Sequence, residues 1–166
     1  TLKKLMKREG RQPDDMNATG GYEDGQGVVS TVMSQDLVTK RYTPLAPMIT
    51  ARSGHATAVL DGKLFVMGGY NYGCLSSVEC LDLQTGQRSA MAPMITARSH
   101  HGAAVLGGKI YVAGGSPVNT VGTLVESFDA ATNQWTAVTP MNTPRFYHGL
   151  LSAQGKLFAV GGFNYQ

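Results

Sequence analysis

The sequence predicts an all-β fold that is built from a repeated unit of four short strands. Glycine supplies 21 of the 166 residues, well above the usual share of about 7%. The same landmarks recur at intervals of 46 and 47 residues, and each interval contains short apolar runs joined by a glycine-containing connection. Self-similarity at this period indicates supersecondary units that pack side by side.

A Pro-Met pair ends each repeat, and the next repeat contains an arginine and, three residues later, a histidine. The pairs Pro47-Met48, Pro93-Met94 and Pro140-Met141 are 46 and 47 residues apart. The arginines and histidines that follow are Arg52 and His55, Arg98 and His101, and Arg145 and His148. Next come Asp61-Gly-Lys-Leu-Phe-Val-Met-Gly-Gly69, Gly107-Gly-Lys-Ile-Tyr-Val-Ala-Gly-Gly115 and Gln154-Gly-Lys-Leu-Phe-Ala-Val-Gly-Gly162. Chance does not explain so many ordered matches.

The first complete repeat shows how each unit divides into strands. Residues 55–60 predict the first strand and residues 63–67 the second, because a short glycine-containing connection between apolar runs is typical of a β-hairpin. Residues 77–82 predict the third strand, and a fourth leads into Pro93-Met94. Four antiparallel strands in each interval form one blade of a β-propeller.

These motifs resemble the kelch repeat, which has a double glycine followed by a spaced Tyr and Trp. The resemblance covers roughly residues 20–166 and implies a kelch-type β-propeller of about three blades. The third-strand landmark Val78-Glu-x-Leu-Asp82 recurs as Val125-Glu-x-Phe-Asp129. The aromatic pair is complete only as Phe128 with Trp135, since Leu81 with Arg88 and Gln35 with Tyr42 fill the other slots. These replacements put tight packing of the outer strands in question.

The repeat pattern predicts the domain organisation. Complete kelch repeats are expected at residues 49–94 and 95–141, with partial repeats at residues 20–48 and 142–166. Residues 1–19 are expected to be a basic tail or the end of a preceding domain, because residues 11–19 do not form the apolar strand that should precede Gly20-Gly21. Since closed propellers have about four to eight blades, the piece is expected to belong to a longer chain.

Composition argues against several classes of protein. The formal charge is +3, but five of the fourteen basic residues lie in the first eleven positions, so a basic surface for nucleic acid is not expected. No apolar run is long enough to cross a membrane, so a membrane partner is not expected either. The two cysteines, Cys74 and Cys80, lie in one repeat and favour a reduced, cytoplasmic protein without a zinc site.

Strand direction predicts one binding face. The connection that contains each arginine and the loop after each double glycine should lie at the same end of a blade. Arginine and tyrosine are enriched among the residues that dominate protein interfaces, and arginine pairs with carboxylates. The expected ligand is therefore an acidic peptide or loop of another protein. The predicted partner-binding residues are Arg52, Ser53, Arg98, Ser99, His100, Arg145, Phe146, Tyr70, Asn71, Tyr72, Asn119, Phe163, Asn164 and Tyr165.

Two alternatives concern the repeating polar residues. In kelch-like substrate adaptors, arginines at the entry to the innermost strand bind acidic segments, and by resemblance Arg52, Arg98 and Arg145 occupy that position. The alternative is that these arginines brace adjacent loops. The repeating histidines are expected to make structural hydrogen bonds rather than to hold a metal, because no acidic or thiolate group repeats beside them. His100 has no histidine counterpart in the other repeats, which favours a specific contact.

The resemblance implies a protein-interaction module without a cofactor. The favoured function is the substrate-recognition propeller of a kelch-like adaptor of a cullin-RING ubiquitin ligase, with BTB and BACK domains upstream that would contact cullin. An actin-binding kelch protein is the alternative. A kelch-fold enzyme, such as a copper oxidase or a sugar epimerase, is disfavoured because no catalytic motif is present, although Cys74, Tyr70 or Tyr72, and His55 could be combined on paper.

Overall fold

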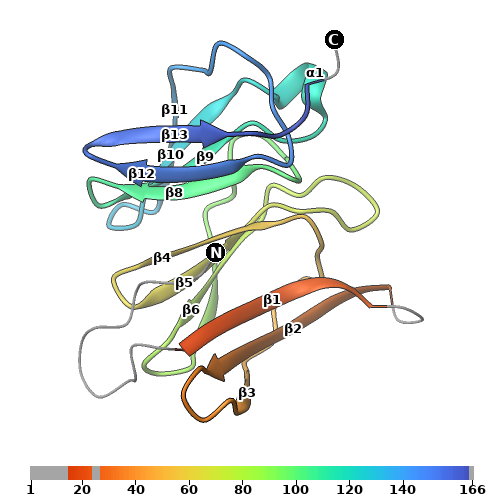
Figure 1. Cartoon of the computed structure of the whole chain (residues 1–166), viewed down its shortest axis with the longest axis vertical. Helices are drawn as coiled ribbons and strands as arrows, with labels where there is room; N and C mark the ends of the chain where they lie inside the picture. The colour runs from red at the N-terminus through yellow and green to blue at the C-terminus, as the bar shows by residue number, and fades with distance from the viewer. Residues whose placement is uncertain (1–14, 24–26, 165–166) are drawn as a thin grey trace.

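The computed structural model describes residues 15–23 and 27–164. Its elements form four antiparallel sheets that follow one another along the chain (Figure 1). The strands are β1 (Asp15–Glu23), β2 (Gly27–Asp36), β3 (Tyr42–Leu45), β4 (Ala56–Leu60), β5 (Lys63–Met67), β6 (Val78–Asp82), β7 (Arg88–Met91), β8 (Gly102–Leu106), β9 (Lys109–Ala113), β10 (Val125–Asp129), β11 (Gln134–Val138), β12 (Gly149–Ala153) and β13 (Lys156–Val160), and the helix is α1 (Val118–Val121).

Two of the sheets are complete four-stranded blades. Strands β4 to β7 form the first complete blade, and strands β8 to β11 form the second. Strands β1 to β3 form the first partial blade, and strands β12 and β13 form the last partial blade. The strand order in each sheet follows the chain, which confirms a partial β-propeller with the predicted meander.

The hairpin between the first two strands is tight in both complete blades and in the last partial blade, as predicted. Asp61 and Gly62 have φ angles of 50° and 72°, so both lie in the left-handed region that the favoured two-residue hairpin turn requires. The turn sets the register in which Leu60 pairs with Lys63 and Ala56 with Met67. Equivalent left-handed pairs connect β8 to β9 and β12 to β13.

Neighbouring blades meet through their innermost strands and through a mixed apolar core. Strand β8 lies against both β4 and β12, as Figure 1 shows. Between the complete blades, Phe65 and Phe128 meet edge to face with ring centroids 5.8 Å apart. Both side chains are almost fully buried, so this aromatic pair contributes strongly to the junction of the blades.

The double glycines lie where two blades approach most closely. Gly68 has a φ of +61°, and a Cβ on it would lie 2.5 Å from the carbonyl oxygen of Arg98 in the next blade. Gly69 has a φ of +102°, and a Cβ on it would lie 2.7 Å from the carbonyl oxygen of Ser53 in its own blade. Any side chain would therefore collide with backbone, which explains why this glycine pair recurs.

The first sheet begins earlier than the sequence predicts. Strand β1 starts at Asp15 and pairs with β2 along its length, with a register shift between Thr19 and Gly21. Residues 15–19 therefore belong to the sheet and not to a tail, which corrects the expected boundary at residue 20. The apolar pattern missed this strand because β1 is an edge strand that is held to β2 by backbone pairing. The rest of the predicted tail, residues 1–14, lies outside the described residues.

In both complete blades a side chain of the outer strand donates a hydrogen bond to a carbonyl oxygen just before the blade, although only the second blade has the aromatic pair. Trp135 donates from Nε1 to the carbonyl oxygen of Ala92 at 2.9 Å, and its ring lies 4.9 Å from that of Phe128. Arg88 occupies the tryptophan position in the first complete blade and donates to the equivalent carbonyl, that of Ala46, at 2.7 Å. The guanidinium thus replaces the indole as the donor of this hydrogen bond.

Candidate functional site

Two sets of loops lie together at one end of the blades. Backbone bridges join Ser53 to Tyr70, Ser99 to Ser116, and Phe146 to Phe163. Each bridge connects the segment that enters an innermost strand with the loop that follows the double glycine. The prediction that these loops share one end is confirmed, and we call this end the loop face, formed by residues 49–55, 70–77, 95–101, 116–124, 142–148 and 163–164.

Arg52 and Arg98 lie beneath the loop face rather than on it. Both side chains have 0% exposure. Arg98 donates from Nη1 to the carbonyl oxygens of Gly114 and Leu124, both at 2.9 Å, and pairs through Nη2 with Glu126. Arg52 makes the equivalent bonds in the blade before. Each guanidinium therefore ties the end of the second strand to the start of the third.

The carboxylates that pair with these arginines are buried too. Glu126 is 2% exposed, and its oxygens also accept from the backbone N–H groups of Ile95 and Thr96 at 2.8 Å and 3.1 Å. Glu79 accepts from Ile49 and Thr50 in the same way. The repeated glutamate thus links the connection between blades to the arginine. Sequence reasoning recorded the Val-Glu landmark but missed this role, which its recurrence 27 and 28 residues after the arginine could have indicated.

This network matches the expectation that the arginines brace adjacent loops. Burial lowers the pKa of Arg98 from its ordinary value, and the negative charge of Glu126 opposes that effect. Arg52 and Arg98 offer no surface to a ligand. Of the three arginines that were predicted to bind an acidic ligand, only Arg145 remains accessible. Arg145 is half-buried and donates from Nη1 to the carbonyl oxygen of Gly161 at 2.8 Å.

The repeating histidines pack between glycines of neighbouring blades. The ring of His101 lies against Gly68 of the preceding blade, and its Cβ lies against Gly115 of its own blade. His148 lies against Gly114 and Gly162 in the same manner. The ring nitrogens of both have no hydrogen-bond partner within the described residues, so the predicted structural hydrogen bond is wrong for them. Burial, followed by the charge of Arg98, lowers the pKa of His101 well below its ordinary value.

His100 has counterparts in position, although not in residue type. Its N–H donates to the carbonyl oxygen of Gly54 at 2.6 Å, and its own carbonyl oxygen accepts from Tyr147 at 2.8 Å. Gly54, His100 and Tyr147 have φ angles of 57°, 54° and 55°. The rings of His100 and Tyr147 lie 4.1 Å apart. Tyr147 was not among the predicted site residues. Its position 47 residues after His100, which is one repeat further along the chain, could have indicated that it is the equivalent residue.

The other predicted site residues divide by exposure. Tyr70, Tyr72, Asn119 and Phe163 are exposed, and Tyr72 is fully so at 101%. Ser53, Asn71, His100 and Asn164 are half-buried, and Asn71 donates to the carbonyl oxygen of Ala51 at 3.0 Å. Ser99 and Phe146 are buried. Tyr165 lies outside the described residues. Exposed aromatic side chains, rather than arginines, thus dominate the loop face.

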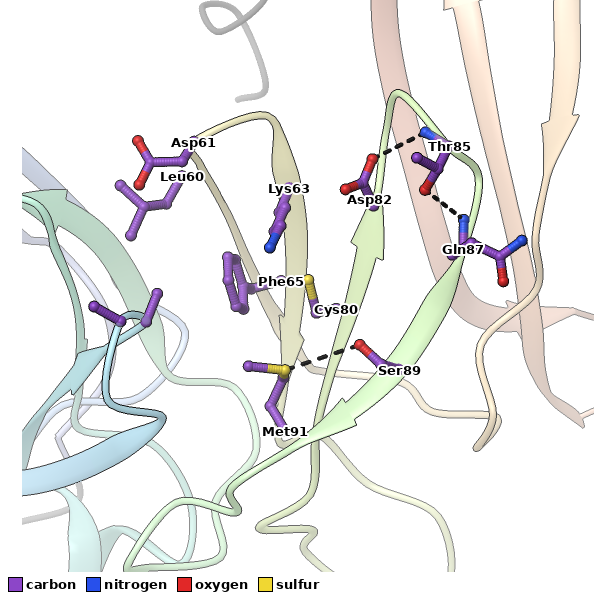
Figure 2. Close-up of a pocket in the computed structure, with 12 residues that line it drawn as sticks. Leu60, Asp61, Lys63, Phe65, Cys80, Asp82, Thr85, Gln87, Ser89 and Met91 are labelled. Carbon is purple, nitrogen blue, oxygen red and sulfur yellow. Dashed lines mark hydrogen bonds between the residues drawn. The ribbon is translucent and has the colours of Figure 1, made fainter.

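A cavity of about 450 Å³ lies at the opposite end, beside the hairpins of the first complete blade (Figure 2). Phe65 and Cys80, which pair across β5 and β6, form part of its wall, and Ala130 and Ala131 close it from the next blade. The carboxylate of Asp82 accepts hydrogen bonds from the N–H groups of Gln84 and Thr85, so it stabilises the turn that follows β6. The cavity is thus a gap between two blades, and part of the polar groups that line it already form hydrogen bonds within the protein.

Three further findings concern the described residues. No three His, Cys, Asp or Glu side chains within them come together as a metal site. Cys74 and Cys80 are free thiols, and Sγ of Cys74 lies 3.5 Å from Oγ of Ser99 and 3.3 Å from the carbonyl oxygen of Ser116. The one helix in this part of the chain, α1, has four residues, and no helix there can cross a membrane.

Comparison with known families decides the classification. The model of the KLHDC2/KLHL20/DRC7 Kelch-repeats domain matches residues 12–166. The chain belongs to the kelch-repeat family. Among curated kelch relatives, Kelch-like protein 25 of Xenopus laevis is 40% identical over 52 residues, which are 31% of this chain and 9% of that protein. Kelch-like protein 25 of Homo sapiens shows the same identity and coverage, and that of Xenopus tropicalis is 38% identical. This kelch chain therefore matches only a small part of the length of these relatives.

Proposed function

We propose that the chain recognises substrates for a cullin-RING ubiquitin ligase and binds them through the loop face. Membership of the kelch-repeat family and similarity to Kelch-like protein 25 support a protein-interaction module. The observation that carries the proposal is the exposure of Tyr70, Tyr72, Tyr147 and Phe163 at one end of a scaffold whose two complete blades each contain a buried ion pair. Binding residues are commonly placed on loops that a rigid scaffold positions.

We propose two partners. A substrate protein binds at the loop face, and cullin binds BTB and BACK domains elsewhere in the protein. The proposed location is the cytoplasm. The test is to express the complete open reading frame in cells, recover it and identify bound proteins by mass spectrometry. Tyr72→Asn and Tyr147→Asn variants should lose substrate proteins but keep cullin. The Tyr42→Asn variant is the control, because Tyr42 is 62% exposed but lies on the outer strand β3.

The abundance of the recovered partners in cells distinguishes the adaptor function from the alternatives. Substrates of an adaptor should accumulate when the gene is deleted and when the proteasome is inhibited. Recovery without cullin, and with no change in partner abundance, would contradict the adaptor role. Co-sedimentation of the protein with filamentous actin, if lost in Tyr72→Asn and Tyr147→Asn, would instead support the cytoskeletal alternative.

A further inference from the structure

The loop face carries almost no exposed charge. The entry segments 49–55, 95–101 and 142–148 and the loops 68–77, 114–124 and 161–164 contain no Asp, Glu or Lys. Two of their three arginines are fully buried against glutamates. Burial also lowers the pKa of His100, so its ring is neutral at physiological pH. A charged group of a partner that was buried here would find few counter-charges and would lose hydration.

Aromatic rings cross this uncharged face from blade to blade. We call Tyr70, Tyr72, His100, Tyr147 and Phe163 the aromatic band. Tyr70 forms a bridge with Cys74, whose Sγ lies 3.5 Å from Ser99, and Oγ of Ser99 lies 3.1 Å from Nδ1 of His100.

From His100 the band continues onto the last partial blade. The ring of Tyr147 lies 4.1 Å from that of His100 and meets the ring of Phe163 edge to face at 6.3 Å. Tyr147 and Phe163 are 59% and 63% exposed. The rings of His100, Tyr147 and Phe163 thus form one connected set on loops that are distant in sequence. Tyr70 and Tyr72 lie on the loop that reaches Ser99 through Cys74.

The backbone under the band is held in an unusual conformation. Tyr72, His100 and Tyr147 have φ angles of 55°, 54° and 55°, a region that residues other than glycine rarely adopt. Glycine occupies the position of His100 in the first complete blade, as Gly54, so the fold itself does not demand a ring there. Left-handed backbone at bulky residues is costly and concentrates at functional sites. The placement of these rings therefore has a cost that binding would explain.

We propose that the aromatic band binds an uncharged segment of a partner protein through an aromatic or large aliphatic side chain. This inference rests on the proposed function and specifies the chemistry of the partner. Tyrosine supplies a large and rigid contact area, and its hydroxyl can bond to the backbone of the bound segment. The half-buried Asn71 lies on the loop of Tyr70 and Tyr72, the exposed Asn119 lies on another loop of the loop face, and both add uncharged polar groups. The partner differs in charge from the acidic ligand that the arginine pattern predicts.

The test selects ligands without assuming their chemistry. A phage library of random peptides is panned against the complete chain, and the enriched peptides are sequenced and synthesised for fluorescence polarisation. We expect enrichment of aromatic and aliphatic residues and depletion of Asp and Glu. Binding should change less than about twofold between about 50 mM and about 500 mM salt, because no ion pair needs to form.

Matched variants locate the binding on the band. Tyr72→Asn and Tyr147→Asn should each weaken binding by about tenfold or more, as expected for central aromatic contacts. Asparagine tolerates a positive φ, so these variants keep the backbone conformation. Tyr42→Asn removes a tyrosine of similar exposure from β3 and should change binding by less than about twofold. Urea unfolding of each variant verifies that the fold is retained.

Each other outcome has a defined meaning. Enriched acidic peptides whose binding weakens with salt and with Arg145→Ala, but not with the tyrosine variants, would overturn the band proposal and leave protein binding intact. Equal losses in the Tyr42→Asn control would also overturn it. A folded chain that enriches no peptide would count against both the band proposal and the proposed function.

Discussion

Replacement of Arg98 by methionine tests whether the repeated arginines brace the propeller. Arg98 and Glu126 are 0% and 2% exposed. Methionine would fill part of the space but leave the Glu126 carboxylate buried without its counter-charge. Breaking a buried pair in this way costs about 3–5 kcal/mol. A domain of this kind is stable by about 5–15 kcal/mol in total, so a large share of the stability should be lost.

Urea unfolding can measure this loss with a probe that the chain already contains. Trp135 is the single tryptophan, and its indole packs on Phe128 in the same blade as Arg98. With a denaturant dependence of about 2 kcal/mol per M for urea, the unfolding midpoint of Arg98→Met should fall by about 2 M.

Arg145→Met provides the matched control, because Arg145 is half-buried and has one hydrogen bond to Gly161 in this structure. It should cost about 1 kcal/mol or less. The bracing argument is refuted if Arg98→Met is as stable as Arg145→Met. Loss of partner binding by a fully stable Arg98→Met variant would instead support a direct binding role.

Three other predictions follow from the contacts between blades. Gly68→Ala should cost more than about 3 kcal/mol in urea unfolding, because the new Cβ meets the carbonyl oxygen of Arg98, whereas Gly86→Ala, in open space at φ +72°, should cost about 1 kcal/mol. The pKa of His101 is depressed in the folded state, so the unfolded chain binds the proton first, and the free energy of unfolding should fall as pH drops below about 6.5. His101→Leu should show a smaller fall between about pH 7.5 and about pH 5.5. A pH profile that is unchanged in this variant would contradict the argument. Trp135→Phe should lose about 1 kcal/mol in thermal unfolding followed by circular dichroism, and Trp135→Arg should recover part of it by bonding to Ala92 as Arg88 bonds to Ala46; equal losses in both variants would argue against the hydrogen bond.

The sequence predicted most of the fold because the repeat shows each strand more than once. The predicted strands at residues 63–67 and 77–82 are observed as β5 and β6 with at most one residue of difference. Strand β1 was missed because it lacks the apolar pattern that marked the others. Its pairing depends on backbone groups, which any sequence supplies.

The common end of the loops was predicted, but the exposure of the residues on it was not. Strand polarity alone places the loops of Arg98 and Tyr70 at one end, and the bridges between loops confirm it. Exposure cannot be read from residue type, because a recurring arginine is equally compatible with a ligand contact and with a buried ion pair. The distance from Arg98 to Glu126, which lie 28 residues apart in the chain, decides between them.

The sequence by itself determined that this protein is a kelch-type propeller made of repeated four-stranded blades, because the spacing of its glycines, arginines and histidines is written into the chain. Only the tertiary structure decided which recurring residues face solvent. The fold of one blade brings Glu126 to Arg98, and the junction of two blades brings Gly68 to His101; these contacts bury the charged and polar groups that the sequence displays most prominently. Tyr72 and Tyr147, which meet no such buried partner charge within the described residues, remain exposed on the loops.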